Sequence, residues 1–169
     1  MLVTACVLPA ARAAEKSSPD QRLAALGLVL PAVPAAVANY TPAVRSGNLV
    51  FLAGQIPRGS DGKYLKGKVG HDFTEAQATA AARTCALQLL AALKAEIGDL
   101  GRVKRIVRVG GFVNCTADFT AHPQVINGAS DLLVAVFGES GRHARASVGV
   151  SSLPAGAPVE IELTAEVME

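Results

Sequence analysis

The stretch "GRHARASVGVSSLPAGAPVEIELTAEV", Gly141–Val167, carries the strongest sheet pattern in the chain. In its first half, Val148 and Val150 alternate with small residues, and in its second half aliphatic residues alternate with polar ones. Alternation with a period of two is typical of strands that bury one face. The segment "LPAGAP" between the halves predicts a turn. We therefore expect the two strands to pair as a hairpin.

Three charged side chains interrupt this apolar pattern: Arg145, Glu160 and Glu162. By alternation, Arg145 shares a strand face with Ser147, and the two glutamates share a face of the following strand. A solvent-exposed sheet face accounts for such charges in the ordinary case. The alternative is a bound small acid, because the neighbours of Arg145 are small and a guanidinium can bind a carboxylate at two points.

The remaining segments predict a single α+β domain. They are a short helix near 18–27, a hairpin around 46–48, a helix from Thr74 to Gly98, a strand over 103–113 and a helix over 124–138. With the quoted strands, the order is β-β-α-β-α-β-β after a short N-terminal helix. We expect one domain over 19–169 and a flexible tail or signal remnant over 1–18.

The N-terminus leaves the compartment open. An apolar stretch, Leu2–Ala10, precedes Ala11-Arg12-Ala13, which resembles the end of a cleaved secretory signal. A disordered alanine-rich tail is the alternative. No segment is apolar over a length that would cross a membrane, so we expect no membrane partner.

Composition argues against a nucleic-acid partner and a metal centre. Sixteen Lys and Arg face fourteen Asp and Glu, and aromatic residues make up only 4% of the chain. These numbers predict neither a basic surface that would bind phosphates nor a set of aromatic side chains on which bases could stack. The three cysteines and three histidines lack the spacing of a metal site, so no metal is expected. Cys115 is expected to be a packing residue, with a reactive thiol as the alternative.

Four motifs in order carry a family resemblance: "NLVFLAGQIP", "VKRIVRVGGFV", "VINGASDLLVAVFG" and "HARASVGVSSLPAGAPVEIE". Together they resemble the Rid (reactive intermediate deaminase, RidA/YjgF-like) family over roughly residues 38–167. The resemblance implies a chorismate-mutase-like fold, in which two helices pack on one face of a sheet. It also implies a homotrimer with a ligand cleft at each subunit interface, and a cytoplasmic location. A periplasmic or exported protein is the alternative if residues 1–13 end a signal peptide.

The same resemblance implies an activity and its residues. The best-known members hydrolyse 2-imino acids to 2-oxo acids and ammonia without a metal or organic cofactor. Arg145 matches the arginine that clamps the substrate carboxylate, and Glu160 matches the glutamate that orients the attacking water. The substrate-binding positions implied are Tyr40, Ala53, Gly54, Asn127 and Ser147.

Departures from the family pattern keep a second function open. Ala53 replaces a common serine, Ser147 stands where cysteine or valine is usual, and His143 replaces a proline. The alternative to a deaminase is a non-catalytic trimer that binds small carboxylates as a sensor or chaperone. An endoribonuclease, an activity sometimes attached to the family, is disfavoured by the net charge of only +2.

Overall fold

The computed structural model describes residues 17–33 and 39–169. Its helices and strands are α1 (Pro19–Ala25), β1 (Ala43–Ser46), β2 (Leu49–Gln55), α2 (Glu75–Ile97), β3 (Val103–Asn114), α3 (His122–Phe137), β4 (Ala144–Val150) and β5 (Val159–Val167). The α+β order predicted from the sequence is confirmed. The expected N-terminal tail falls almost wholly outside the described residues.

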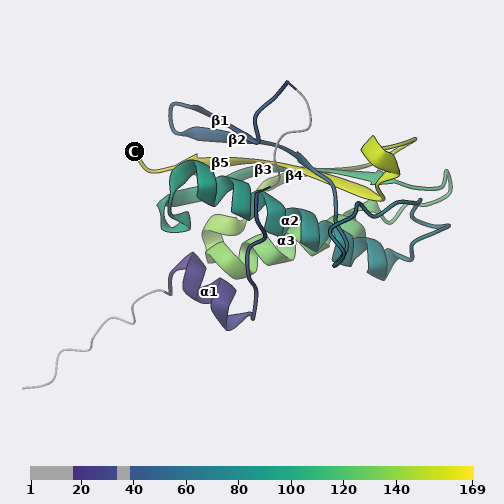
Figure 1. Cartoon of the computed structure of the whole chain (residues 1–169), viewed down its shortest axis with the longest axis horizontal. Helices are drawn as coiled ribbons and strands as arrows, with labels where there is room; N and C mark the ends of the chain where they lie inside the picture. Colours follow the sequence, from purple (N-terminus) through teal and green to yellow (C-terminus); the bar gives the residue numbers. More distant parts are fainter. Residues whose placement is uncertain (1–16, 34–38) are drawn as a thin grey trace, which may run out of the picture.

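The strands form one sheet in the order β1-β2-β5-β3-β4. Helices α2 and α3 cover one face of this sheet, and α1 lies on the far side of the helical layer (Figure 1). The two long helices approach closely at Gly128, where a Cβ atom would collide with the backbone carbonyl of Thr79. We call the sheet face opposite α2 and α3 the open face.

Local sequence signals set the limits of α2. Gln77 donates its backbone N–H to the Thr74 hydroxyl at 3.3 Å, and the Gln77 side chain accepts from the Thr74 backbone at 2.9 Å. This reciprocal capping satisfies two donors that a helix start leaves free. The helix ends at Gly98, whose φ of +83° suits a residue without a side chain.

The expected C-terminal hairpin is wrong. Strand β4 pairs in parallel with β3, and β5 lies between β2 and β3 as their antiparallel neighbour. The crossover through α3 brings the chain back to the end of the sheet where β3 began, so β4 must run parallel to β3. The following strand then gains two hydrogen-bonded neighbours in the centre of the sheet and buries its aliphatic residues there.

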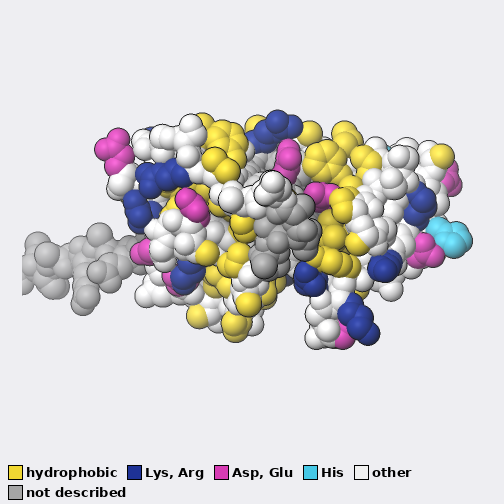
Figure 2. Space-filling model, turned by 45° about the horizontal axis from the view of Figure 1, so that its top comes forward, with side chains coloured by type: hydrophobic (Ala, Val, Ile, Leu, Met, Phe, Trp, Pro, Cys, Tyr) yellow, Lys and Arg dark blue, Asp and Glu magenta, His cyan; other side chains and the backbone are white. Residues whose placement is uncertain are grey.

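The open face carries both apolar and charged side chains. Val44, Phe51 and Val148 are exposed on it. Charged side chains lie among them, from Arg108, Glu160 and Glu162. Figure 2, in which the sheet side of Figure 1 turns toward the viewer, shows hydrophobic, acidic and basic side chains interspersed. Within the described ranges, no helix has the length and apolarity that crossing a membrane requires.

Candidate active site

The structure divides the site residues suggested by the sequence into two groups on opposite faces of the sheet. Asn127, Arg145 and Ser147 lie where β4 meets α3, and we call them the arginine half-site. Tyr40, Ala53, Gly54 and Glu160 lie around β1, β2 and β5, and we call them the carboxylate half-site.

The guanidinium of Arg145 is held against α3 by neutral groups. Its Nη1 donates to Asn127 Oδ1 at 2.8 Å and to Ser130 Oγ at 3.0 Å. Among the described residues, no carboxylate oxygen lies within 4.0 Å of this side chain. The guanidinium is therefore positioned without being neutralised, and its remaining N–H groups are available to an anion.

His143 extends this network on the other side of Ser130. Its Nε2 lies 3.0 Å from Ser130 Oγ, and its Nδ1 lies 2.7 Å from the Gly141 carbonyl oxygen. Because a carbonyl only accepts, Nδ1 carries the hydrogen and Nε2 accepts from the Ser130 hydroxyl. Burial lowers the pKa of His143, and the charge of Arg145 lowers it further, against the opposing effect of the Gly141 hydrogen bond. The neutral ring thus fixes the direction of the Ser130 hydroxyl.

Ser130 was missed by the sequence reasoning. It lies three residues after Asn127 on α3, and that spacing places both side chains on one face of a helix. The spacing is the signal that could have found it. Ser147, by contrast, was predicted, and its Oγ is buried with no hydrogen-bond partner among the described residues. This hydroxyl can still donate or accept one hydrogen bond.

The carboxylate half-site depends on the absence of a side chain at Gly54. The register between β2 and β5 shifts between Leu52 and Gln55, which places Gly54 against the side chain of Glu160. A Cβ atom at position 54 would collide with Glu160 Oε1. Nearby, Tyr40 and Ala53 line an apolar pocket of about 600 Å³ with neighbours from β1 and β2.

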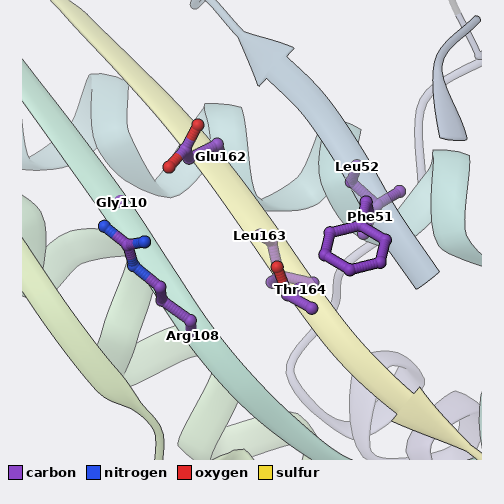
Figure 3. A pocket seen from close by; sticks show the side chains of 7 residues that line it. All are labelled: Phe51, Leu52, Arg108, Gly110, Glu162, Leu163 and Thr164. Carbon is purple, nitrogen blue, oxygen red and sulfur yellow. The ribbon is translucent and has the colours of Figure 1, made fainter. Parts of the chain in front are cut away.

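The half-buried carboxyl of Glu160 has an altered acidity. Burial raises its pKa, and the negative charge of Glu162 on the same strand face raises it further. Glu162 in turn lines a hollow of about 240 Å³ on the open face, together with Phe51 and Arg108. Figure 3 shows these side chains coming from three neighbouring strands. Neither Glu162 nor Arg108 was among the sequence-predicted site residues, although Glu162 was noted as a charge on the strand face that it shares with Glu160.

The sheet itself separates Arg145 from Glu160. Arg145 is in register with the buried Val109, so its side chain points to the helical side of the sheet. Glu160 alternates with the buried Val159 and Ile161, so its side chain points to the open face. One small ligand cannot contact both side chains of the same chain.

The comparisons with known proteins agree with this architecture. The model of a family described as "YjgF/chorismate mutase-like, putative endoribonuclease" matches residues 20–167. The chain belongs to this YjgF/RidA-like family. The resemblance inferred from the four motifs is thereby confirmed, and so is the chorismate-mutase-like fold.

Three similar proteins show how far this likeness extends. Protein TCP17 of Trypanosoma cruzi is 46% identical over 143 residues, covering 84% of this chain and 89% of the relative. A 2-iminobutanoate/2-iminopropanoate deaminase of Dermatophagoides farinae is 32% identical, covering 78% of this chain and 88% of the relative. The crystal structure of Atu1372 from Agrobacterium tumefaciens, a protein of unknown function, superposes with a TM-score of 0.80 at 44% identity, covering 88% of this chain and 91% of that one.

Proposed function

We propose that this YjgF/RidA-like protein is an imine or enamine deaminase that hydrolyses small 2-imino acids to 2-oxo acids and ammonia. The observation that carries the proposal is the arginine half-site. Arg145 is oriented by two neutral acceptors, Asn127 and Ser130, and retains a charge that no described carboxylate neutralises. A 2-imino acid presents a carboxylate of the size and geometry that a guanidinium fork binds. The deaminase of Dermatophagoides farinae, at 32% identity, supports the same reaction class.

The chemistry requires positioning and a water molecule. The protonated C=N carbon of a 2-imino acid is electrophilic, so water adds to it and forms a C–O bond. A carboxylate at Glu160 accepts a proton from this water, and the proton then passes to the departing nitrogen. The C–N bond then breaks and ammonia leaves with the electron pair, while the hydroxyl oxygen forms the C=O bond and gives its proton to the Glu160 carboxylate, so that a 2-oxo acid remains. The raised pKa of Glu160 makes its carboxylate a better proton acceptor.

A second copy of the chain completes the proposed site. The two half-sites lie on opposite faces of one sheet, so Arg145 of one subunit must meet Glu160 of a neighbouring subunit. The exposed apolar side chains of Val44, Phe51 and Val148 on the open face favour such packing. We therefore propose a homotrimer with a shared cleft at each interface. No metal or organic cofactor is required for this chemistry.

The non-catalytic alternative also has an observation in its favour. The arginine half-site alone contains what is needed to hold a small carboxylate, because the Arg145 guanidinium is oriented by Asn127 and Ser130 without being neutralised. A trimer that binds 2-oxo acids and does not turn over imines would need no contribution from Glu160. The chain nevertheless has a carboxyl group with a raised pKa at Glu160, which a binding module would not need. This observation favours the deaminase over the binding module.

The test couples this protein to a threonine dehydratase that generates 2-iminobutanoate in place. We expect the wild-type protein to accelerate release of 2-oxobutanoate above the uncatalysed rate. Arg145→Ala should lower kcat/KM roughly thirtyfold to thousandfold, since it removes a charge-assisted two-point contact. Arg142→Ala is the matched control, because Arg142 pairs with the exposed Glu139 and lies outside both half-sites.

The outcomes separate the two functions. An undiminished rate in Arg145→Ala would contradict the carboxylate clamp. If the wild-type protein does not accelerate hydrolysis, yet binds 2-oxobutanoate in a manner that depends on Arg145, the binding module replaces the deaminase.

A further inference from the structure

Another pocket lies farther along the seam between β4 and α3. It encloses about 550 Å³ and is lined by Lys68, Cys115, Thr116, Ala117, Phe119, His122, Gly149, Val150 and Ser151. Arg145 and Gly149 are four residues apart on β4, which corresponds to roughly 13 Å at about 3.3 Å per strand residue. The pocket is therefore displaced from Arg145 along β4, and Ser147 lies between them on the same strand face.

A thiol and an imidazole meet in this pocket. Cys115 follows the last residue of β3, and His122 is the first residue of α3, so the intervening loop brings the chain back on itself. Cys115 Sγ lies 3.4 Å from His122 Nε2. The ring of Phe119 meets the His122 ring edge-on, with 5.6 Å between centroids, and limits how the imidazole can turn.

The absence of a side chain at Gly149 lets this pair pack closely against β4. A Cβ atom at position 149 would lie 2.5 Å from His122 Nε2 and 3.0 Å from Cys115 Sγ. Any other residue would therefore push against both reactive atoms or cover them.

Lys68 supplies a positive charge to the same pocket. Its Nζ donates to Asn114 Oδ1 at 2.7 Å and to the Ser151 carbonyl oxygen at 2.7 Å, and both acceptors are neutral. In the described ranges, no carboxylate oxygen lies within 4.0 Å of Lys68 Nζ. An ammonium has three hydrogens, so one remains for an incoming anion.

Several neighbouring groups act on the acidity of the Cys115 thiol, and together they raise its pKa. Burial raises the pKa of the Cys115 thiol, whereas the charge of Lys68 lowers it. The carboxylate of Asp118 acts in the raising direction. The thiol therefore needs a base that removes its proton during reaction, and His122 Nε2 is the group within reach.

We propose that Cys115, His122 and Lys68 form a second reactive site, which captures small carboxylates that carry an electrophilic carbon. Lys68 binds the carboxylate, His122 takes the thiol proton, and Sγ forms a bond to the electrophilic carbon. With a leaving group on that carbon, the group departs with its electron pair. With a conjugated double bond, the electron pair moves to the carbon next to the carboxylate, which then takes the proton back from His122.

The other cysteine that the structure describes lacks these features. Cys85 is fully buried in α2, and burial raises the pKa of its thiol well above the usual range. The described residues contain no group of three or more metal-ligating side chains, so the pair at Cys115 has no third ligand for a metal. A reactive thiol at Cys115 was the alternative left open by the sequence, and the geometry favours it over simple packing.

Competing alkylation by iodoacetate and iodoacetamide tests the proposal. The two reagents transfer similar carbon groups and release iodide, but only iodoacetate carries a negative charge. The full-length Cys6→Ser variant removes the third thiol, and mass spectrometry of peptides reports on Cys115 and Cys85 separately. We expect the iodoacetate-to-iodoacetamide rate ratio at Cys115 to exceed that of 2-mercaptoethanol by about tenfold.

Variants assign the roles within the pocket. Lys68→Met should return the ratio to that of 2-mercaptoethanol, while Lys66→Met, at an exposed position that does not line the pocket, should leave the ratio unchanged. His122→Gln should slow both reagents about tenfold or more without changing the ratio. His71→Gln is the control for His122→Gln, because His71 is exposed and does not line the pocket, and this variant should leave both rates unchanged.

Two results would overturn the site. One is a wild-type ratio equal to that of 2-mercaptoethanol, and the other is a Cys115 that reacts only after denaturation. Both are measured on the folded Cys6→Ser protein, so neither depends on whether the pocket variants fold. Neither reagent is an imine, and the readout is therefore independent of the deaminase assay.

Discussion

The carboxylate of Glu160 on β5 occupies the space that a side chain at position 54 on β2 would need. The two residues come from neighbouring strands, and the register shift after Leu52 brings them together. The position of the proposed proton acceptor is therefore set by a glycine more than one hundred residues earlier in the chain.

Gly54→Ala should disable the carboxylate half-site. The new methyl group would displace Glu160, so we expect imine hydrolysis to fall at least about tenfold and the free energy of unfolding to fall by about 1–3 kcal/mol. Gly47→Ala is the control: its φ is +58° and nothing lies within 4 Å of the added atom. That variant should lose about 1 kcal/mol of stability through backbone strain and keep its activity. Equal activity losses in both variants would contradict the proposed contact.

The raised pKa of Glu160 predicts how stability depends on pH. Burial and the charge of Glu162 make the folded protein bind this proton more tightly than the unfolded chain does. Ionisation of Glu160 therefore destabilises the fold, and this loss develops as pH rises from the unfolded pKa through the higher folded pKa. Glu160→Gln should be more stable than the wild type at about pH 8, and the difference should shrink toward about pH 4. Urea denaturation at both pH values measures it, with the exposed Glu139→Gln as control. If the stability difference between Glu160→Gln and the wild type stays constant between these pH values, the pKa of Glu160 is not raised in the folded protein.

Asn127→Asp should weaken carboxylate binding more than Asn127→Ala does. Asn127 Oδ1 accepts from Arg145 Nη1 at 2.8 Å, so a carboxylate placed there would pair with the guanidinium and neutralise it. Calorimetric titration with 2-oxobutanoate should show affinity reduced about tenfold or more for Asn127→Asp. Asn127→Ala removes only a hydrogen bond that orients Arg145, so its affinity for 2-oxobutanoate should fall by less than that of Asn127→Asp. If the order is reversed, orientation of Arg145 matters more than its free charge.

Local signals in the sequence predicted much of this fold. Thr74 and Gln77 marked the start of α2, and alternation marked the buried face of β5. The pairing of the strands could not be predicted in this way, because the same alternation fits a strand in an edge hairpin and a strand in the centre of a sheet equally well. Whether β5 pairs with β4 or enters between β2 and β3 depends on contacts with distant segments.

The site was predictable only in part, for the same reason. Arg145 and Glu160 stood out as charges in apolar strands, but their separation by the sheet required the topology. The contact between Cys115 and His122 depends on a loop that reverses the chain and on the absence of a side chain at Gly149. No periodic pattern in the sequence predicts the chain reversal or the close packing at Gly149.

The pKa of His143 should respond to Arg145. Burial is the larger cause of the lowered pKa of His143, and the nearby guanidinium charge adds to it. Removing that charge in Arg145→Ala favours the imidazolium, so the pKa should rise without returning fully to its ordinary value. NMR titration of the His143 ring measures the change. Arg142→Ala is the control, because Arg142 is held by Glu139. An unchanged pKa in Arg145→Ala would show that the guanidinium does not lie beside this network in solution.

Mixed subunits should restore activity if the two half-sites meet only between copies. Arg145→Ala and Glu160→Gln proteins should each be strongly impaired alone, because every interface then lacks one group. After unfolding and refolding together in equal amounts, about a quarter of the interfaces in a homotrimer should join an intact Arg145 to an intact Glu160. Light scattering first checks that each variant forms a trimer, and the imine hydrolysis assay then measures recovery. A mixture of Arg145→Ala with the double variant Arg145→Ala/Glu160→Gln is the control, since no interface in it contains Arg145. Because the sheet lies between these residues within one chain, no recovery in the first mixture would contradict a site shared between subunits.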